Sequence, residues 1–209
     1  MGQAVSMIEQ GIDINYDSVA THIPWVMQQL YTDSNLNSTS LPELRDAFRP
    51  HQMQGKAWLL DQARQFDRNS KVLVIGSWLG FTSYCLYKMG FTDISETDPD
   101  FRLAGLANSL NRENNRFIHY AQDVNQLSLD QYDLIINPSC EHIGDDSWFD
   151  RARPGCSFVL HSTNLKWHDH VNTVNSVEEM LLKYPMDLTF SGELVLNPTY
   201  SRYMLVGNK

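Results

Sequence analysis

The chain has 209 residues, of which 42% are hydrophobic and 20% charged, a composition typical of one globular domain and not of a disordered chain. No apolar run approaches the roughly 18 residues of a membrane span, so no membrane partner is expected. The three cysteines of the chain (Cys85, Cys140 and Cys156) form no CxxC pair, and we expect a cytoplasmic protein. The net charge of −9 and the lack of a Lys/Arg cluster disfavour duplex nucleic acid and favour a small-molecule or cationic substrate.

Residues 1–69 are expected to form a helical cap of the same domain, and the clearest helix in it covers residues 51–66, after Pro50. From Lys71 onward, short apolar runs alternate with helical patterns, which predicts βαβ units and an α/β sandwich. The predicted strands cover 72–75, the surroundings of Ile94, 117–120, 134–136 and 158–160, and the clearest helices cover 81–89 and 101–111.

The last two strands, 188–196 and 200–206, are joined by only three residues, Asn197-Pro198-Thr199. This link is too short for a parallel crossover, so the two strands must pair antiparallel. The sequence therefore predicts a three-layer Rossmann-like sheet that is mostly parallel and ends in an antiparallel hairpin.

The turn after the first strand reads Gly76-Ser77-Trp78-Leu79-Gly80. Glycines in such a turn let the backbone approach a ligand that lies over the carboxyl edge of the sheet. A dinucleotide-binding turn has a second glycine that leaves room for pyrophosphate, and Trp78 stands in that position. The turn therefore disfavours NAD, while Gly76, Ser77, Trp78 and Gly80 stay candidates for binding another cofactor.

Acidic residues follow the second and third strands. Asp98 lies about 20 residues beyond the turn, where a carboxylate can accept hydrogen bonds from both hydroxyls of a ribose; Glu96 is the reserve for this role. The alternative for Asp98 is a helix cap. After the third strand, Asp123 can accept from an adenine amino group while Val124 packs on the ring, or Asp123 is a solvated residue at the strand end.

In this order and spacing, the motifs resemble the class I S-adenosylmethionine-dependent methyltransferases over roughly residues 70–207. A parallel sheet finished by an antiparallel hairpin is the plan of that family, so residues 70–209 would form its cofactor-binding domain. The resemblance implies S-adenosyl-L-methionine as the cofactor. It also implies which residues contact each part of this molecule: Gly76 and Gly80 the methionine moiety, Asp98 the ribose, and Asp123 with Val124 the adenine.

The fourth strand ends in Asn137-Pro138-Ser139-Cys140-Glu141-His142, which begins like the Asn-Pro-Pro-aromatic motif of amino methyltransferases. The second proline is missing and Cys140 replaces the aromatic residue, which disfavours methylation of a nucleic-acid base. Asn137 is a candidate for both cofactor and acceptor binding. Glu141 and His142 are candidates for handling the proton that the acceptor loses; the alternatives are a helix-end histidine and an acid favoured by the helix dipole.

The segment after the fifth strand contains His161, His168 and His170. We expect it to close over the substrate, with His170 as a fourth catalytic candidate. The alternative is a metal site in which His168 and His170 bind from an extended segment together with Glu141; because no cysteine accompanies them and methyl transfer needs no metal, no metal is expected. Tyr200 and Arg202 in the final hairpin are further candidates to reach the pocket, but a cross-strand pair on the surface of the sheet is the favoured interpretation.

The leading hypothesis is a methyltransferase that acts on a small molecule or another non-duplex substrate, mainly by positioning it. Gln52, Gln54 or Lys56 of the cap would reach the carboxylate of the donor. The alternatives are transfer of the aminocarboxypropyl group of the same donor, a non-catalytic protein that binds the donor, and, less favoured, a nicotinamide oxidoreductase.

Overall fold

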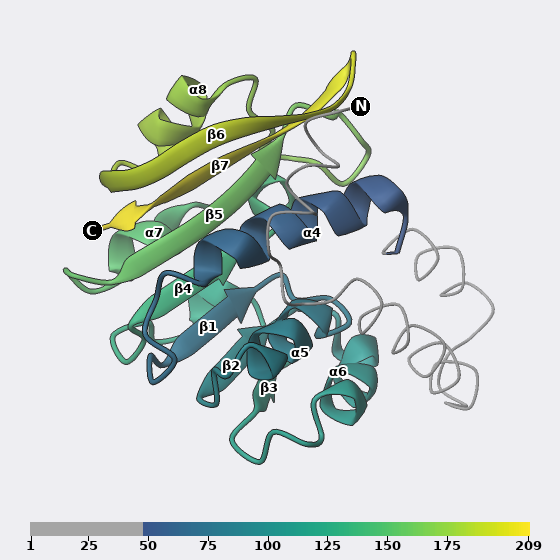
Figure 1. Cartoon of the computed structure of the whole chain (residues 1–209), viewed down its shortest axis with the longest axis vertical. Helices are drawn as coiled ribbons and strands as arrows, with labels where there is room; N and C mark the ends of the chain where they lie inside the picture. The colour runs from purple at the N-terminus through teal and green to yellow at the C-terminus, as the bar shows by residue number, and fades with distance from the viewer. Residues whose placement is uncertain (1–47) are drawn as a thin grey trace.

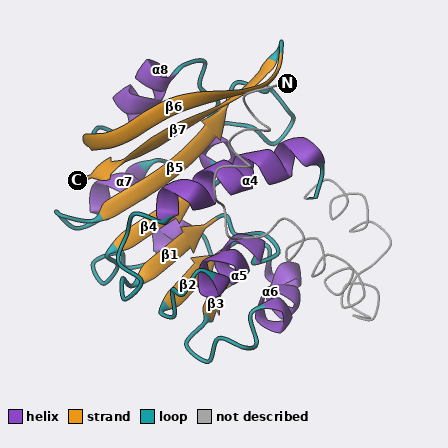
Figure 2. Ribbon diagram, in the orientation of Figure 1, coloured by secondary structure: helices purple, strands orange, loops and turns teal. Residues whose placement is uncertain are grey.

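The computed structural model describes residues 48–209, so the expectations for residues 1–47 lie outside the described part of the chain. Seven strands form one sheet in the order β3-β2-β1-β4-β5-β7-β6 (Figures 1 and 2). The strands are β1 (Val72–Ile75), β2 (Ile94–Thr97), β3 (Ile118–Tyr120), β4 (Leu134–Asn137), β5 (Ser157–Thr163), β6 (Asp187–Asn197) and β7 (Tyr200–Asn208). The helices are α4 (Pro50–Ala63), α5 (Phe81–Lys88), α6 (Ala104–Leu110), α7 (Ser147–Arg151) and α8 (Val177–Lys183).

Strands β1 to β5 pair in parallel, and β7 lies antiparallel between β5 and β6. Strands β1 and β4 are buried throughout, which explains their unbroken apolar sequences, because helices cover both faces of a parallel sheet. Strand β6 forms an edge of the sheet and alternates between exposed and half-buried side chains along much of its length.

The helices form a layer on each side of the sheet (Figure 1). On one side, α4, α5 and α6 contribute Trp58, Phe81 and Leu106 to a core that packs on Val72 and Val74 of β1. On the other side, α7 and α8 contribute a second core that includes Trp148 and Met180 and packs on the alternate residues of β1. No helix in residues 48–209 is long and apolar enough to span a membrane.

The predicted fold class, the strands and the C-terminal hairpin are confirmed. The predicted helix over residues 101–111 begins as a 3₁₀ turn, Phe101–Leu103, which the Asp100 carboxylate caps by accepting a hydrogen bond from the Arg102 amide. Strand β5 extends three residues beyond its apolar run, because it pairs with β7 as far as Thr163.

Candidate active site

The turn after β1 contains three residues with left-handed backbone conformation: Gly76 (φ 61°), Trp78 (φ 53°) and Gly80 (φ 73°). At Gly80 the fold also requires a residue without a side chain, because an added Cβ would lie 2.8 Å from the Asn111 Nδ2 atom of the neighbouring helix end. At Gly76 an added Cβ would meet nothing nearer than Ser139, at 3.9 Å. The backbone at Gly76 is therefore open toward the segment that follows β4.

Asp98 holds this turn in place. Its Oδ2 accepts a hydrogen bond from the Trp78 amide at 2.9 Å, and its Oδ1 accepts one from the Asp100 amide at 3.0 Å. Burial raises the pKa of Asp98 above its ordinary value, and the two backbone hydrogen bonds oppose this rise. Each carboxylate oxygen can accept a further hydrogen bond. Asp98 itself does not line the cleft described below and is bonded to its lining residue Trp78, so contact of Asp98 with a ligand stays a prediction.

Glu96, the reserve for the ribose role, is placed differently. Its side chain is fully buried, and its oxygens contact the Ser83 hydroxyl at 2.5 Å and the His119 Nδ1 atom at 2.8 Å. Ser83 lies on α5 and His119 on β3. Both oxygens of Glu96 thus have partners between the sheet and α5, and Glu96 does not line the cleft described next.

A cleft of about 510 Å³, including space open to solvent, lies against the Gly76–Gly80 turn. Four parts of the chain meet at this cleft. They are α4 with Phe48 ahead of it, the turn after β1 with the start of α5, the residues after β4, and the strands β5 and β7. The lining residues are Phe48, Gln52, Lys56, Gly76, Ser77, Trp78, Leu79, Phe81, Thr82, Pro138, Ser139, His161 and Arg202. Gln52 and Lys56 were expected near the donor carboxylate, and both lie here; Gln54 does not line the cleft.

The interpretation of Arg202 as a surface residue is wrong, because this residue is only 5% exposed and lines the cleft. Its Nε donates to the Tyr200 hydroxyl at 3.0 Å and its Nη2 to the Gln52 side-chain oxygen at 2.8 Å. Its Nη1 lies 3.6 Å from Glu141 Oε1. Strand β7 lies inside the sheet and α4 crosses over it, so the side chain is enclosed.

His161 of β5 lies beside Arg202 under α4. Gly55 permits this close approach, because an added Cβ there would lie 2.9 Å from Arg202 Cδ and 3.1 Å from His161 Cε1. Burial, together with the positive charges of Arg202 and Lys56, lowers the pKa of His161 well below its ordinary value. His161 is therefore neutral at pH 7, and the positive charge of the cleft comes from the two longer side chains.

Several buried polar atoms around the cleft have no hydrogen-bond partner within the described chain. They are Ser77 Oγ, Asn137 Nδ2, Glu141 Oε2 and His161 Nε2. Buried polar groups in folded proteins are nearly always paired. Four of the eleven such atoms in the described chain lie here: Ser77 and His161 line the cleft, Asn137 precedes its lining residue Pro138, and Glu141 lies 3.6 Å from Arg202. A polar ligand in the cleft would supply missing partners.

The segment after β4 is fixed by local hydrogen bonds. Asn137 Oδ1 accepts from the Ser139 amide at 2.9 Å, and residues Cys140–His142 form a 3₁₀ turn. The loop after β5 packs against this turn, because the Asn172 amide donates to the Glu141 carbonyl at 2.9 Å and its side-chain nitrogen donates to the Ile143 carbonyl at 2.9 Å. The two segments therefore hold each other in position.

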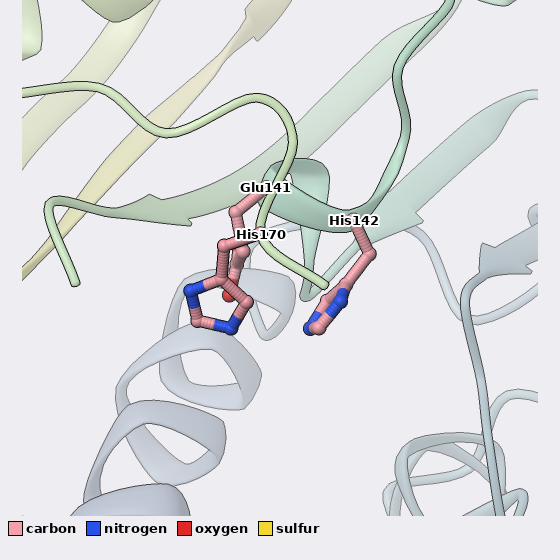
Figure 3. A group of neighbouring side chains, drawn as sticks. All are labelled: Glu141, His142 and His170. Carbon is pink, nitrogen blue, oxygen red and sulfur yellow. The ribbon is translucent and has the colours of Figure 1, made fainter. Parts of the chain in front are cut away.

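The loop after β5 brings His170 next to His142, with 4.7 Å between their ring centroids (Figure 3). The extended segment of the alternative metal site with His168 and His170 is not found, because the His170 amide donates to the Trp167 carbonyl at 3.1 Å and closes a turn. His168 is exposed and does not belong to this group. The catalytic candidates Glu141, His142 and His170 are thus brought together, and Asn137 ends the strand that leads to them.

Asp123 and Val124, the candidates for adenine binding, lie at the carboxyl end of β3. The exposed Asp123 accepts from the Asn125 amide at 2.8 Å and caps the 3₁₀ turn Val124–Gln126. Val124 is only 4% exposed and packs in the second core. Neither residue lines the cleft, so contact of these two residues with a ligand stays a prediction.

No protein-family model matches the sequence, and no curated protein matches it. Solved structures do match the fold. An N-methyltransferase, NodS from Bradyrhizobium japonicum WM9 in complex with S-adenosyl-L-homocysteine, aligns with a TM-score of 0.64 at 13% identity over 88% of this chain and 99% of its own. Magnesium protoporphyrin IX methyltransferase from Synechocystis PCC 6803 with bound S-adenosylhomocysteine aligns with a TM-score of 0.60 at 15% identity, over 88% and 93%.

A geranyl diphosphate methyltransferase in complex with S-adenosylmethionine aligns with a TM-score of 0.61 at 9% identity, over 76% of this chain and 86% of its own. Identities this low speak for the fold, and the seven-stranded sheet with its antiparallel C-terminal strands agrees with them. The chain therefore has the Rossmann-like fold of the class I S-adenosylmethionine-dependent methyltransferases.

Proposed function

We propose that the chain binds S-adenosyl-L-methionine in the cleft beside the Gly76–Gly80 turn and transfers its methyl group to a small molecule. The observation that carries this proposal is the set of buried, unpartnered polar atoms around the cleft, of which Ser77 Oγ and Asn137 Nδ2 lie at the ends of β1 and β4. In open α/β sheets, ligands bind at the carboxyl ends of the strands. The solved structures of this fold with bound S-adenosylmethionine or S-adenosylhomocysteine support the choice of ligand.

The charges of the cleft fit the donor. Its methionine part carries a carboxylate, and Arg202, Lys56 and Gln52 present cationic and amide groups to the cleft. A guanidinium binds a carboxylate with two parallel hydrogen bonds. Gly76, Ser77, Trp78 and Gly80 would then contact the methionine part and Asp98 the ribose. Asp123 and Val124 would contact the adenine beyond the cleft, at the end of β3.

Methyl transfer requires mainly that the acceptor be held in line with the donor. Bound S-adenosylmethionine supplies an activated methyl group, and the thioether leaves when a lone pair of the acceptor forms the new bond. Asn137 would orient the acceptor and contact the donor. Glu141, His142 and His170 would hold the reacting atom and take up the proton that it releases.

Calorimetric titration of the full chain tests the first step. We expect S-adenosylmethionine and S-adenosylhomocysteine to bind with one-to-one stoichiometry and NAD not to bind. Ser77→Ala should weaken donor binding by about 1 kcal/mol, the value of one hydrogen bond, whereas Ser191→Ala on the edge strand β6 should leave it unchanged. Binding of NAD without binding of either methyl-donor ligand would contradict the proposal.

The acceptor is sought by incubating the protein with labelled donor and pools of small molecules, with duplex DNA and RNA as separate pools. We expect label in the small-molecule pools and not in the nucleic-acid pools, because a net charge of −9 disfavours the binding of nucleic acid. Label found only in a nucleic-acid pool would contradict the proposed substrate class, while donor binding would still stand.

A further inference from the structure

Glu141, His142 and His170 present one possible ligand atom each, and these three atoms lie within 4.8 Å of one another. Figure 3 shows the three side chains directed to the same side of the two backbone segments that carry them. We propose that these residues form a binding site for a divalent transition-metal ion, which when bound would engage the lone pairs that the metal-free side chains use to take up a proton.

His170 has the orientation that a metal ligand requires, and His142 lies near a carboxylate. His170 Nδ1 lies 2.5 Å from the Leu165 carbonyl oxygen, and His142 Nδ1 lies 3.5 Å from Asp169 Oδ2. A carbonyl oxygen can only accept, so Nδ1 of His170 carries the proton and Nε2 keeps its lone pair. Histidines that bind metals almost always donate their other ring N–H to a carbonyl or carboxylate in this way.

Glu141 supplies the negative charge. The residue is only 1% exposed; its Oε1 lies 3.6 Å from Arg202 Nη1, whereas its Oε2 has no partner. Leaving a buried carboxylate oxygen unpaired is costly. A cation beside Oε2 would remove this cost, and because Arg202 engages the other oxygen, the two positive charges would lie on opposite oxygens.

The ligand types select the metal. Two imidazoles and one carboxylate, with coordination positions left open, suit Zn²⁺, Fe²⁺, Co²⁺ or Mn²⁺, whereas Mg²⁺ prefers oxygen ligands. A tetrahedral ion at about 2.1 Å from each ligand atom places these atoms about 3.4 Å apart. The separations of up to 4.8 Å must therefore shrink, and the His142 side chain, which is 40% exposed, has the freedom to rotate inward.

Metal titration of the full chain, first treated with a chelator, tests the site. We expect one equivalent of Zn²⁺ by calorimetry and of Co²⁺ by visible absorption, with Mg²⁺ bound at least about 100-fold more weakly. His142→Ala and His170→Ala should each weaken Zn²⁺ binding by at least about tenfold, since even the loss of an outer partner costs about 10- to 100-fold. His168→Ala is the matched control, because this exposed histidine lies in the same loop outside the group.

Circular dichroism of each variant establishes that it is folded, and Glu141→Gln, which keeps the shape and removes the charge, should weaken binding as well. No Zn²⁺ or Co²⁺ binding at millimolar concentration would overturn the proposal, as would binding that both histidine variants retain or that His168→Ala loses equally. The titrations contain no methyl donor, and donor binding is measured on the metal-free chain. Failure of the metal site is therefore distinguishable from failure of the proposed function.

Discussion

Replacing Asp98 with alanine tests how the β1 turn and the donor site depend on one carboxylate. The side chain accepts hydrogen bonds from the Trp78 and Asp100 amides at 2.9 and 3.0 Å. A hydrogen bond to a charged group contributes about 1.5–3 kcal/mol net of the bonds to water that it replaces, so the two contribute about 3–6 kcal/mol. Because the side chain is only half-buried, we expect Asp98→Ala to lower the free energy of unfolding by the smaller amount, about 3 kcal/mol.

The same variant should also weaken the binding of S-adenosylhomocysteine. Ribose hydroxyls left without a charged acceptor cost about 1–3 kcal/mol, which is roughly 5- to 150-fold in affinity. Urea denaturation measures the free energy of unfolding, and calorimetry on the folded protein measures the affinity.

Asp100→Ala is the control for this experiment. The Asp100 carboxylate caps a turn by accepting from the Arg102 amide at 3.1 Å, and its hydrogen bonds go to Arg102 and not to the β1 turn. Its loss should cost about 1 kcal/mol of stability and no affinity. Unchanged affinity in Asp98→Ala, or an equal loss of affinity in Asp100→Ala, would refute the assignment of Asp98 to the ribose.

Three further predictions concern buried positions. Gly80→Ala should lower the free energy of unfolding, measured by urea denaturation, by about 2–5 kcal/mol, the sum of left-handed strain and crowding against Asn111. Gly76→Ala should lower it only by the strain, about 1–2 kcal/mol. Equal losses in the two variants would contradict the packing argument. Glu96→Ala should cost about 2–5 kcal/mol, because it leaves its buried partners unpaired; weaker donor binding by the folded variant would instead make Glu96 the ribose ligand. Stability should fall below pH 6.5, because the unfolded chain takes up a proton at His161 that the folded chain cannot, with a slope of up to about 1.4 kcal/mol per pH unit. Urea titrations at several pH values should show that the stability of His161→Asn lacks this contribution to the pH dependence. An identical pH dependence of the variant and the unchanged protein would contradict the prediction.

The sequence predicted most of the sheet because its strands are short apolar runs bounded by turn residues. It did not predict α7 and α8, which have five and seven residues, too few turns to show a helical period. Strand β2 was predicted only as an apolar run around Ile94, because the burial of its polar Glu96 depends on partners from α5 and β3 that are distant in sequence.

The site was predicted less completely. Arg202 was misplaced because the alternation of a strand does not tell which face another element covers, and α4 covers this one. The proximity of His142 and His170 depends on a turn within an irregular loop, which local patterns do not specify. The ending of the fourth strand, residues 137–142, was the stretch of sequence that best indicated this region, and the structure adds that Glu141 in it is buried with Oε2 unpartnered.

The hydrogen bonds of Asn172 join the segment after β4 to the segment after β5. They therefore bear on how the specificity for the acceptor can be changed. The turn after β1 and Asp98 are bonded to the sheet, whereas the segments 138–143 and 164–174 are also bonded to each other through Asn172. A chimera that receives both segments from a homologue would keep their mutual contacts. A chimera that receives only one would keep the bonds from Asn172 to the Glu141 and Ile143 carbonyls only where the two backbones still match. Exchange of acceptor specificity between such proteins therefore requires the two segments to be transplanted as a pair.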